Sequence, residues 1–171
     1  MLKLSFDLDG VIAEGRYVAR PQQLIEYMSL GLYDQDTRCV WNRLCREHEV
    51  FILTSRSFAG SGKQVAHWLT EQSLTLPVGI LTMSPTHTTH ADKAKLMEPL
   101  GFDAHFDDSP VVCEAIDRLD YHTRPYLMNN PGWQENQDLM WGADRIYSWK
   151  QIEETIETLN LRELQTLTSY L

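Results

Sequence analysis

Residues 2–11 read LKLSFDLDGV. Apolar and polar residues alternate along this stretch, and two aspartates and a glycine stand near its end. The alternation over residues 2–8 predicts a β-strand, and Asp9-Gly10 is a turn signal that ends it. Side chains two residues apart on an extended strand point the same way, so Asp7 and Asp9 should lie side by side. This stretch therefore predicts a strand that delivers two carboxylates to one edge of a sheet.

Apolar runs and amphipathic patterns alternate along the rest of the chain. Continuous apolar runs predict further strands at residues 50–53 and 78–81, and shorter segments predict strands at residues 104–106, 125–128 and 145–147. Apolar residues at helical spacing predict helices at residues 21–30, 36–48, 61–72, 91–100, 110–119 and 149–170. Strands alternating with helices are typical of an α/β fold, so we expect a three-layer, Rossmann-like parallel sheet with helices on both faces.

The bulk composition limits the class of protein. A length of 171 residues predicts a single domain over residues 1–171. The formal net charge of −9 disfavours a nucleic-acid or anionic-membrane partner, because such partners reward clustered Lys and Arg. The sequence has no span-length apolar stretch, no signal-peptide pattern and only three scattered cysteines. We therefore expect a cytoplasmic protein without a disulfide framework, and the sequence predicts no oligomeric state.

Chemically active residues follow several of the predicted strands. They are Asp7, Asp9 and Gly10 after the first strand, Thr54, Ser55 and Arg56 after the second, Lys93 in the helix after the third, and Asp107 and Asp108 after the fourth. In parallel α/β sheets a ligand binds beyond the carboxyl ends of the strands. We therefore expect these segments to meet in one site.

Each residue type in this set has a physical task. Clustered carboxylates repel one another unless a cation intervenes, and Mg²⁺ suits a few carboxylates together with water and a substrate phosphate. Thr54 can donate a hydrogen bond to a phosphoryl oxygen, and Lys93 can neutralise its charge. Gly10 lets the backbone approach closely. The set predicts a magnesium-dependent site for a phosphorylated molecule.

Four segments resemble, in order and spacing, the four motifs of the haloacid dehalogenase-like superfamily. They read FDLDGV at residues 6–11, ILTS at residues 52–55, lysine at position 93 and FDD at residues 106–108. The resemblance covers roughly residues 2–128 and implies phosphatase chemistry, because the aspartate at position 9 supplies the proton that a leaving alkoxide needs.

The resemblance also implies a role for each matching residue. Asp7 would be the nucleophile that forms an aspartyl-phosphate, and Asp9 the general acid and then the general base. Gly10, Thr54, Ser55 and Lys93 would bind the phosphoryl group. Asp7, Asp9 (through its backbone carbonyl) and Asp108 would hold Mg²⁺, with Asp107 supporting them without touching the metal. Whether Asp107 or Asp108 is the direct ligand stays open.

Within this superfamily, the spacing from Asp9 to Thr54 leaves room for a small cap or flap at about residues 13–34. The insertion carries Arg16, Tyr17, Arg20, Tyr27 and Tyr33. An aromatic and basic cap is similar to the 5'(3')-deoxyribonucleotidase branch, and so are the Thr54-Ser55 and Asp107-Asp108 pairs. The turn at residues 131–133 reads Pro-Gly-Trp, where that branch often carries Pro-Trp-Asn.

The sequence thus predicts a hydrolase, a Mg²⁺-dependent phosphomonoesterase of a small phosphorylated metabolite, with a (deoxy)nucleotide as one candidate substrate. Two alternatives are a polynucleotide end phosphatase and a non-catalytic regulator of the same fold that binds a phosphorylated ligand. The acid at Asp9 argues against the regulator, since a pure binder has no use for it. Two interpretations of Arg56 stay open: it touches substrate, or it pairs with surface acids.

Overall fold

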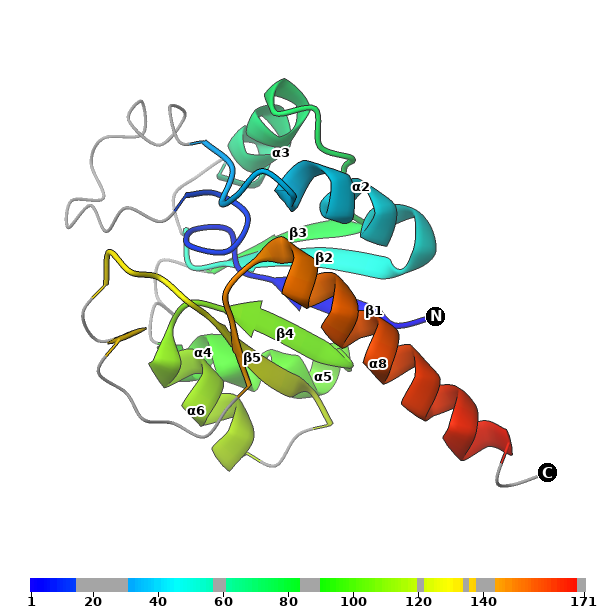
Figure 1. Cartoon of the computed structure of the whole chain (residues 1–171). Helices are drawn as coiled ribbons and strands as arrows, with labels where there is room; N and C mark the ends of the chain where they lie inside the picture. The colour runs from blue at the N-terminus through cyan, green and yellow to red at the C-terminus, as the bar shows by residue number, and fades with distance from the viewer. Residues whose placement is uncertain are drawn as a thin grey trace.

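The computed structural model describes residues 1–14, 31–56, 61–83, 90–119, 122–133, 136–137 and 144–168. These residues form a six-stranded parallel sheet in the order β3-β2-β1-β4-β5-β6 (Figure 1). The strands are β1 (Lys3–Phe6), β2 (Glu49–Thr54), β3 (Gly79–Thr82), β4 (Ala104–Asp107), β5 (Arg124–Met128) and β6 (Arg145–Ile146). All six strands match runs that the sequence predicts as strands.

Helices cover both faces of this sheet. They are α2 (Thr37–Glu47), α3 (Ser61–Glu71), α4 (His90–Lys95), α5 (Met97–Leu100), α6 (Pro110–Arg118) and α8 (Trp149–Thr168). α2, α3 and α8 pack on one face and α4, α5 and α6 on the other, each group with its own apolar core (Figure 1). The predicted three-layer α/β fold is confirmed.

The core on the α8 side is built from aromatic side chains that alternate with polar ones along the central strands. Phe6 of β1 stacks on Phe106 of β4 and on Trp149 of α8, with ring centroids 4.8 and 5.5 Å apart. Trp41 of α2 meets the edge of both Phe6 and Trp149. All four side chains are fully buried. Such rings remove large apolar areas from water, and they fix the two central strands against the helix layer.

One predicted helix, at residues 91–100, is divided in the structure. α4 ends at Lys95 and α5 runs from Met97, with Leu96 between them. Pro99 lies in the second piece, and a proline has no N–H to continue a helical hydrogen-bond ladder. The division leaves Lys93 on the short α4.

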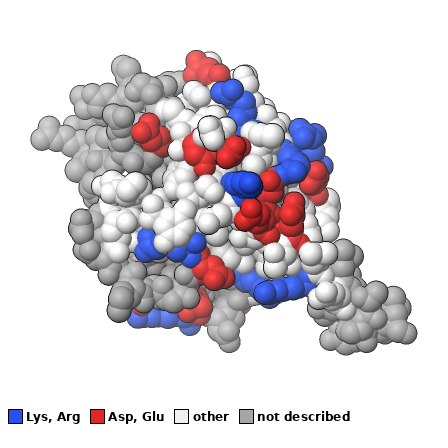
Figure 2. Space-filling model, in the orientation of Figure 1, with Lys and Arg blue, Asp and Glu red and all other residues white. Residues whose placement is uncertain are grey.

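Charged side chains of both signs lie interspersed on the face shown in Figure 2, without a continuous basic patch among the residues drawn there. A basic patch or stripe is the usual footprint of a nucleic-acid binder.

Within the described part of the chain, no helix is both long enough and apolar enough to cross a membrane.

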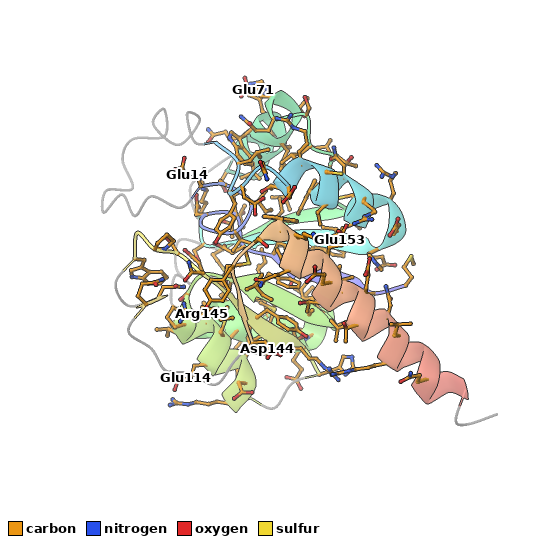
Figure 3. The ribbon with its side chains drawn as sticks, viewed as in Figure 1. Glu14, Glu71, Glu114, Asp144, Arg145 and Glu153 are labelled. Atoms are coloured by element: carbon orange, nitrogen blue, oxygen red, sulfur yellow. The ribbon has the colours of Figure 1, made fainter. Side chains whose placement is uncertain are left out.

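The two ends of the predicted cap lie side by side. The N–H of Glu14, labelled in Figure 3, donates to the carbonyl of Gly31 at 2.9 Å, and the N–H of Tyr33 donates to the carbonyl of Ile12 at 2.9 Å. Ala13 and Leu32 form an antiparallel bridge between these bonds. The helix predicted at residues 21–30 and the cap residues Arg16, Tyr17, Arg20 and Tyr27 lie outside the described residues.

Candidate active site

The candidate site lies where the strand order reverses, between the central strands β1 and β4. Phe6 and Phe106 are register partners, so the residues that follow them are delivered to the same edge. Asp7 is fixed there by its N–H, which donates to the carbonyl of Phe106 at 2.8 Å. Carboxylate oxygens of Asp7, Asp107 and Asp108 all lie within 4.8 Å of one another. Such a point of strand reversal is where open α/β sheets bind their ligands.

Lys93 inserts a single buried cation between two of these acids. Its Nζ lies 2.6 Å from Oδ1 of Asp7 and 2.6 Å from Oδ2 of Asp107, and the residue is 1% exposed. Burial by itself would lower the pKa of Lys93, but Asp107 and Asp7 outweigh it and hold that pKa above its ordinary value. Lys93 is therefore permanently charged, and it ties α4 to the ends of β1 and β4.

Asp107 is almost fully engaged with donors from the protein. Oδ2 accepts from Lys93 and, at 2.9 Å, faces Nε2 of His105, while Oδ1 accepts from the N–H of Ser109 at 2.8 Å. Burial would raise the pKa of Asp107, but the Lys93 ammonium and His105 hold it below its ordinary value. His105 is in turn placed by Ser5, whose Oγ lies 2.8 Å from Nδ1. Asp107 is thus a buried anion held by a lysine, a histidine and a backbone amide.

The negative charges of Asp7 and Asp108 are less well compensated than that of Asp107. Burial raises the pKa of Asp7 to about 7; Lys93 opposes this shift, while Asp107 and Asp9 add to it. Burial also raises the pKa of Asp108 well above its ordinary value, and the neighbouring charges of Asp107 and Asp7 raise it further. Three carboxylates face one lysine, so the ionised cluster needs further positive charge. Carboxylate oxygens that lack compensating positive charge are suitable ligands for a hard divalent cation.

Gly10 makes room for Asp108. Its φ is +79°, a conformation that side-chain-bearing residues rarely adopt, and a Cβ placed there would lie 2.0 Å from Oδ2 of Asp108. The turn after β1 therefore requires glycine both for its conformation and for the approach of the carboxylate.

Asp9 and Arg56 form a second polar group at the same edge. Nε and NH2 of Arg56 donate to Oδ2 and Oδ1 of Asp9 at 2.9 and 2.6 Å. The N–H of Arg56 also donates to Oγ1 of the buried Thr54 at 3.3 Å, while Ser55 is exposed. Of the two interpretations of Arg56, the structure shows pairing with an acid, and that acid is Asp9, the predicted proton donor.

The structure therefore places the predicted residues in two groups. Asp7, Lys93, Asp107 and Asp108 lie in one cluster with Gly10 against it, and Asp9 is joined to Arg56 next to Thr54. The charge of Asp9 contributes to the raised pKa of Asp7, so the two groups are neighbours.

Tyr33 and two asparagines also belong to this neighbourhood. The Tyr33 hydroxyl donates to the carbonyl of Asn129; burial raises its pKa to about 12, with Asp34 and Asp108 adding to the shift. Nδ2 of Asn130 donates to Oδ2 of Asp108 at 2.6 Å, and Asn136 donates to the Asp108 carbonyl at 2.6 Å. Neither asparagine was predicted from the sequence, although Asn130 follows β5 and the same strand-end rule applies to it.

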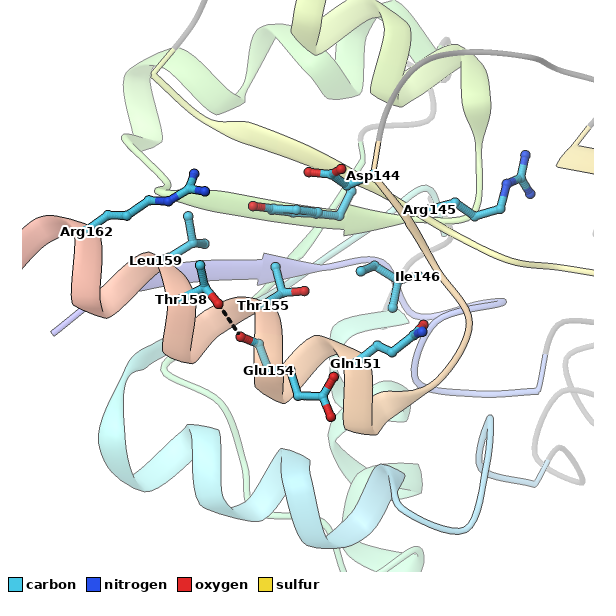
Figure 4. A pocket seen from close by; sticks show the side chains of 10 residues that line it. Asp144, Arg145, Ile146, Gln151, Glu154, Thr155, Thr158, Leu159 and Arg162 are labelled. Carbon is cyan, nitrogen blue, oxygen red and sulfur yellow. Dashed lines mark hydrogen bonds between the residues drawn. The ribbon is translucent and has the colours of Figure 1, made fainter.

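A separate pocket of about 360 Å³ lies between β6 and α8 (Figure 4). Its walls include Asp144, Arg145, Glu154 and Arg162, and none of the predicted site residues. Its polar, mixed-charge lining distinguishes it from the acidic cluster at the sheet edge.

No protein-family model matches the chain, and a sequence comparison with curated proteins finds no significant match. Solved structures match it in fold at 11–14% identity. A haloacid dehalogenase-like hydrolase from Streptococcus pneumoniae is 11% identical with a TM-score of 0.64, over 91% of this chain and 98% of that one. The D,D-heptose 1,7-bisphosphate phosphatase of B. bronchiseptica, complexed with magnesium and phosphate, is 13% identical with a TM-score of 0.60, over 92% of this chain and 99% of that one.

A chain of the Pnkp1/Rnl/Hen1 RNA repair complex is 14% identical with a TM-score of 0.58. That match covers 77% of this chain but only 43% of the longer one. At such identities the matches establish the fold. The chain has the fold of the haloacid dehalogenase-like hydrolases, with a buried cluster of Asp7, Asp107 and Asp108 at its sheet edge.

Proposed function

We propose that this protein is a Mg²⁺-dependent phosphatase that transfers the phosphoryl group of a small phosphomonoester to Asp7. The observation that carries the proposal is the buried cluster of Asp7, Asp107 and Asp108 around a single lysine, at the ligand-binding edge of the sheet. The phosphatase of the same fold that was solved with magnesium and phosphate supports it.

The residues present fit a magnesium ion. Asp7, Asp108 and the backbone carbonyl of Asp9 would hold it, because the oxygens of Asp107 are already engaged with Lys93, His105 and Ser109. When bound, Mg²⁺ supplies positive charge that offsets the phosphate oxygens and the clustered carboxylates.

The reaction then proceeds on the protein's own residues. A carboxylate oxygen of Asp7 forms a bond to phosphorus while the bond to the ester oxygen breaks, and Asp9 gives that oxygen its proton. Asp9 next takes a proton from water, whose oxygen bonds to phosphorus and releases phosphate and free Asp7. Lys93 holds Oδ1 of Asp7, so that one carboxylate oxygen is fixed and the other is left to attack.

Residues near the ends of the neighbouring strands would bind the substrate phosphate. Lys93 provides charge, Thr54 and Ser55 provide hydroxyls, and the glycine turn at Gly10 provides close backbone approach. Thr54 is buried beside Arg56 and Ser55 is exposed at the end of β2, so these hydroxyls would meet the phosphate from different depths.

For the substrate class, we propose a small metabolite, with nucleoside monophosphates as the first candidates because the cap resembles the deoxyribonucleotidase branch. The net charge of −9 disfavours a polynucleotide end as the substrate. The match to a chain of an RNA repair complex makes a phosphorylated oligonucleotide the natural competing substrate to test.

The test is hydrolysis of p-nitrophenyl phosphate, followed by a panel of nucleoside monophosphates, sugar phosphates and a 3'-phosphorylated oligonucleotide. EDTA should abolish activity, Mg²⁺ should restore it, and Asp7→Asn should be inactive. Lys95→Ala is the control, because Lys95 is an exposed lysine on α4, two positions from Lys93; it should retain full activity. Hydrolysis that survives complete chelation would contradict the proposed mechanism.

A further inference from the structure

We propose that Asn130 is a positioning residue of the metal centre: its side-chain amide holds one oxygen of Asp108 and so reserves the other for the cation. This inference rests on the proposed function, because it assigns a task within the same site. Asn130 lies after β5, directly before the turn at residues 131–133, and the sequence predicted no role for Asn130 itself.

The contact is short and the amide orientation is defined. Nδ2 of Asn130 donates to Oδ2 of Asp108 at 2.6 Å, while Oδ1 of Asn130 accepts from the N–H of Gly132 at 3.2 Å. An amide has one donor end and one acceptor end. Since the acceptor end is already turned to a backbone N–H, the donor end must face Asp108. Asn130 is 6% exposed, so water offers little competition for this bond.

The backbone around Asn130 is held as firmly as its side chain. The N–H of Asn130 donates to Oδ1 of Asn136 at 2.9 Å. Nδ2 of Asn136, which is fully buried, donates to the carbonyls of Asp108 and Met128 at 2.6 and 2.8 Å. One asparagine thus fixes the side chain of Asp108 and the other fixes its main chain.

The edge strand β6 completes the support. NH1 and NH2 of Arg145, labelled in Figure 3, donate to Oδ1 and the carbonyl of Asn136 at 2.9 and 2.7 Å. Hydrogen bonds therefore run from Arg145 through Asn136 to Asp108. A metal ligand that is held on both its main chain and its side chain is preorganised, which lowers the cost of binding the cation.

Gly10 shows how tightly this arrangement is packed. A Cβ at Gly10 would lie 2.0 Å from Oδ2 of Asp108 and 3.0 Å from Nδ2 of Asn130. The hydrogen-bonded pair therefore fills the space beside the glycine, and Asp108 has one oxygen committed to Asn130. Asp108 itself belongs to the carboxylate cluster, and we assign its second oxygen to the metal.

The experiment compares Asn130→Ala and Asn130→Leu with the wild type and with Asn129→Ala. Asn130→Leu nearly keeps the size of the side chain and removes the donor without adding a charge, so it separates donation from packing. Asn129 is the adjacent amide, and its Oδ1 accepts hydrogen bonds from Gln137 and Arg145. Mn²⁺ affinity is measured directly by electron paramagnetic resonance, and folding is checked by circular dichroism.

We expect both Asn130 variants to bind Mn²⁺ about 10- to 100-fold more weakly, the usual effect of losing a group that orients a metal ligand. The Mg²⁺ concentration for half-maximal hydrolysis should rise in parallel, and Asn129→Ala should match the wild type in both measurements. If Asn130→Ala does not fold, the comparison rests on Asn130→Leu and on Asn130→Ser.

The outcomes separate this inference from the proposed function. Folded Asn130 variants that bind Mn²⁺ as tightly as the wild type would overturn the role of Asn130 and leave the phosphatase proposal standing. A wild type that binds Mn²⁺, loses affinity in the variants and hydrolyses no phosphomonoester would support the role of Asn130 and refute the phosphatase proposal. A wild type that binds no divalent ion would overturn both.

Discussion

Arg56 bears directly on the task proposed for Asp9. Both carboxylate oxygens of Asp9 accept hydrogen bonds from the guanidinium, a bidentate and charge-assisted geometry that is among the stronger pairings in proteins. Asp9 cannot donate a proton to a leaving group while both of its oxygens are held in this way. The pair has to rearrange when substrate enters, and a phosphate is itself a good partner for a guanidinium. Arg56 would then exchange Asp9 for the substrate.

The roles of the two aspartates on this turn can be separated by mutation. Asp9→Asn should retain metal affinity, because the backbone carbonyl proposed as a ligand is unchanged, but it should lose turnover. General acid–base catalysis is worth about 10²–10⁴-fold, so the loss should be at least that large with an alkyl phosphate. Asp7→Asn should lose both phosphoryl transfer and part of the metal affinity. Metal titration and steady-state rates of the two variants provide the measurement.

The leaving group gives a sharper test of the same role. p-Nitrophenolate needs little protonation, so the burst phase of Asp9→Asn should suffer less with p-nitrophenyl phosphate than with an alkyl phosphate. The later hydrolysis of the aspartyl-phosphate should be slow with both substrates, since the base is lost in either case. Equal impairment of the two burst phases would contradict the acid role of Asp9, even with the fold and metal site intact.

At the scale of secondary-structure elements, Asp34 links the beginnings of two helices. Its Oδ1 accepts from the N–H groups of Asp36 and Thr37, both at 2.9 Å, at the start of α2. Its Oδ2 accepts from the N–H of Trp149 at 2.8 Å, at the start of α8. A carboxylate at a helix N-terminus satisfies unpaired donors and interacts favourably with the helix dipole.

We therefore expect Asp34→Ala to lower the free energy of unfolding by about 1–2 kcal/mol, the usual cost of losing a helix cap. Asp36→Ala is the matched control, because Asp36 occupies the N-cap position of α2 but makes no side-chain capping bond. It should stay within about 0.5 kcal/mol of the wild type. Urea unfolding followed by circular dichroism measures both, and equal losses in the two variants would refute the capping role of Asp34.

The sequence predicted these elements well wherever local pattern determines structure. The alternating apolar residues before Asp7 became β1, and the short run before Asp107 became β4. The predicted helix at 91–100 was divided, because one proline outweighs its amphipathic pattern. Asn130 was missed because a neutral amide carries no charge signal, and its importance depends on a partner 22 residues away. The pairing of Arg56 with Asp9 also depends on side-chain geometry that spacing does not contain.

For the whole molecule, strand order is what creates the site. Asp7 and Asp107 are 100 positions apart in the sequence, yet they follow strands that are direct neighbours in the sheet. The sequence predicted that strand ends would meet at one edge, but it did not predict that β1 and β4 would be the central pair. Solved structures share this fold at 11–14% identity, although no curated protein matches the chain in sequence. The proposed chemistry then depends on which residues occupy the strand ends.

The carboxylate cluster should also make the stability of the whole chain depend on metal and pH together. Burial raises the pKa of Asp7 to about 7 and that of Asp108 well above its ordinary value. Between about pH 4, near the ordinary aspartate pKa, and pH 7, the metal-free folded chain holds protons that the unfolded chain has released. The contribution of these two groups to stability therefore falls as pH rises through that window. Burial lowers the pKa values of His48 and His105, but the pH dependence of these histidines is common to samples with and without metal.

The last prediction concerns the difference that Mg²⁺ makes to thermal stability. Mg²⁺ competes with protons for Asp7 and Asp108, so it should raise the melting temperature more at pH 7.5 than at pH 5. A concentration 100-fold above the dissociation constant contributes about 2.7 kcal/mol, or roughly 5–10 °C for a chain of this size. Asp108→Asn should lose most of this shift at pH 7.5. Differential scanning calorimetry with Mg²⁺ or with EDTA at both pH values measures it, and equal Mg²⁺ shifts at the two pH values would show that the cation binds away from the buried carboxylates.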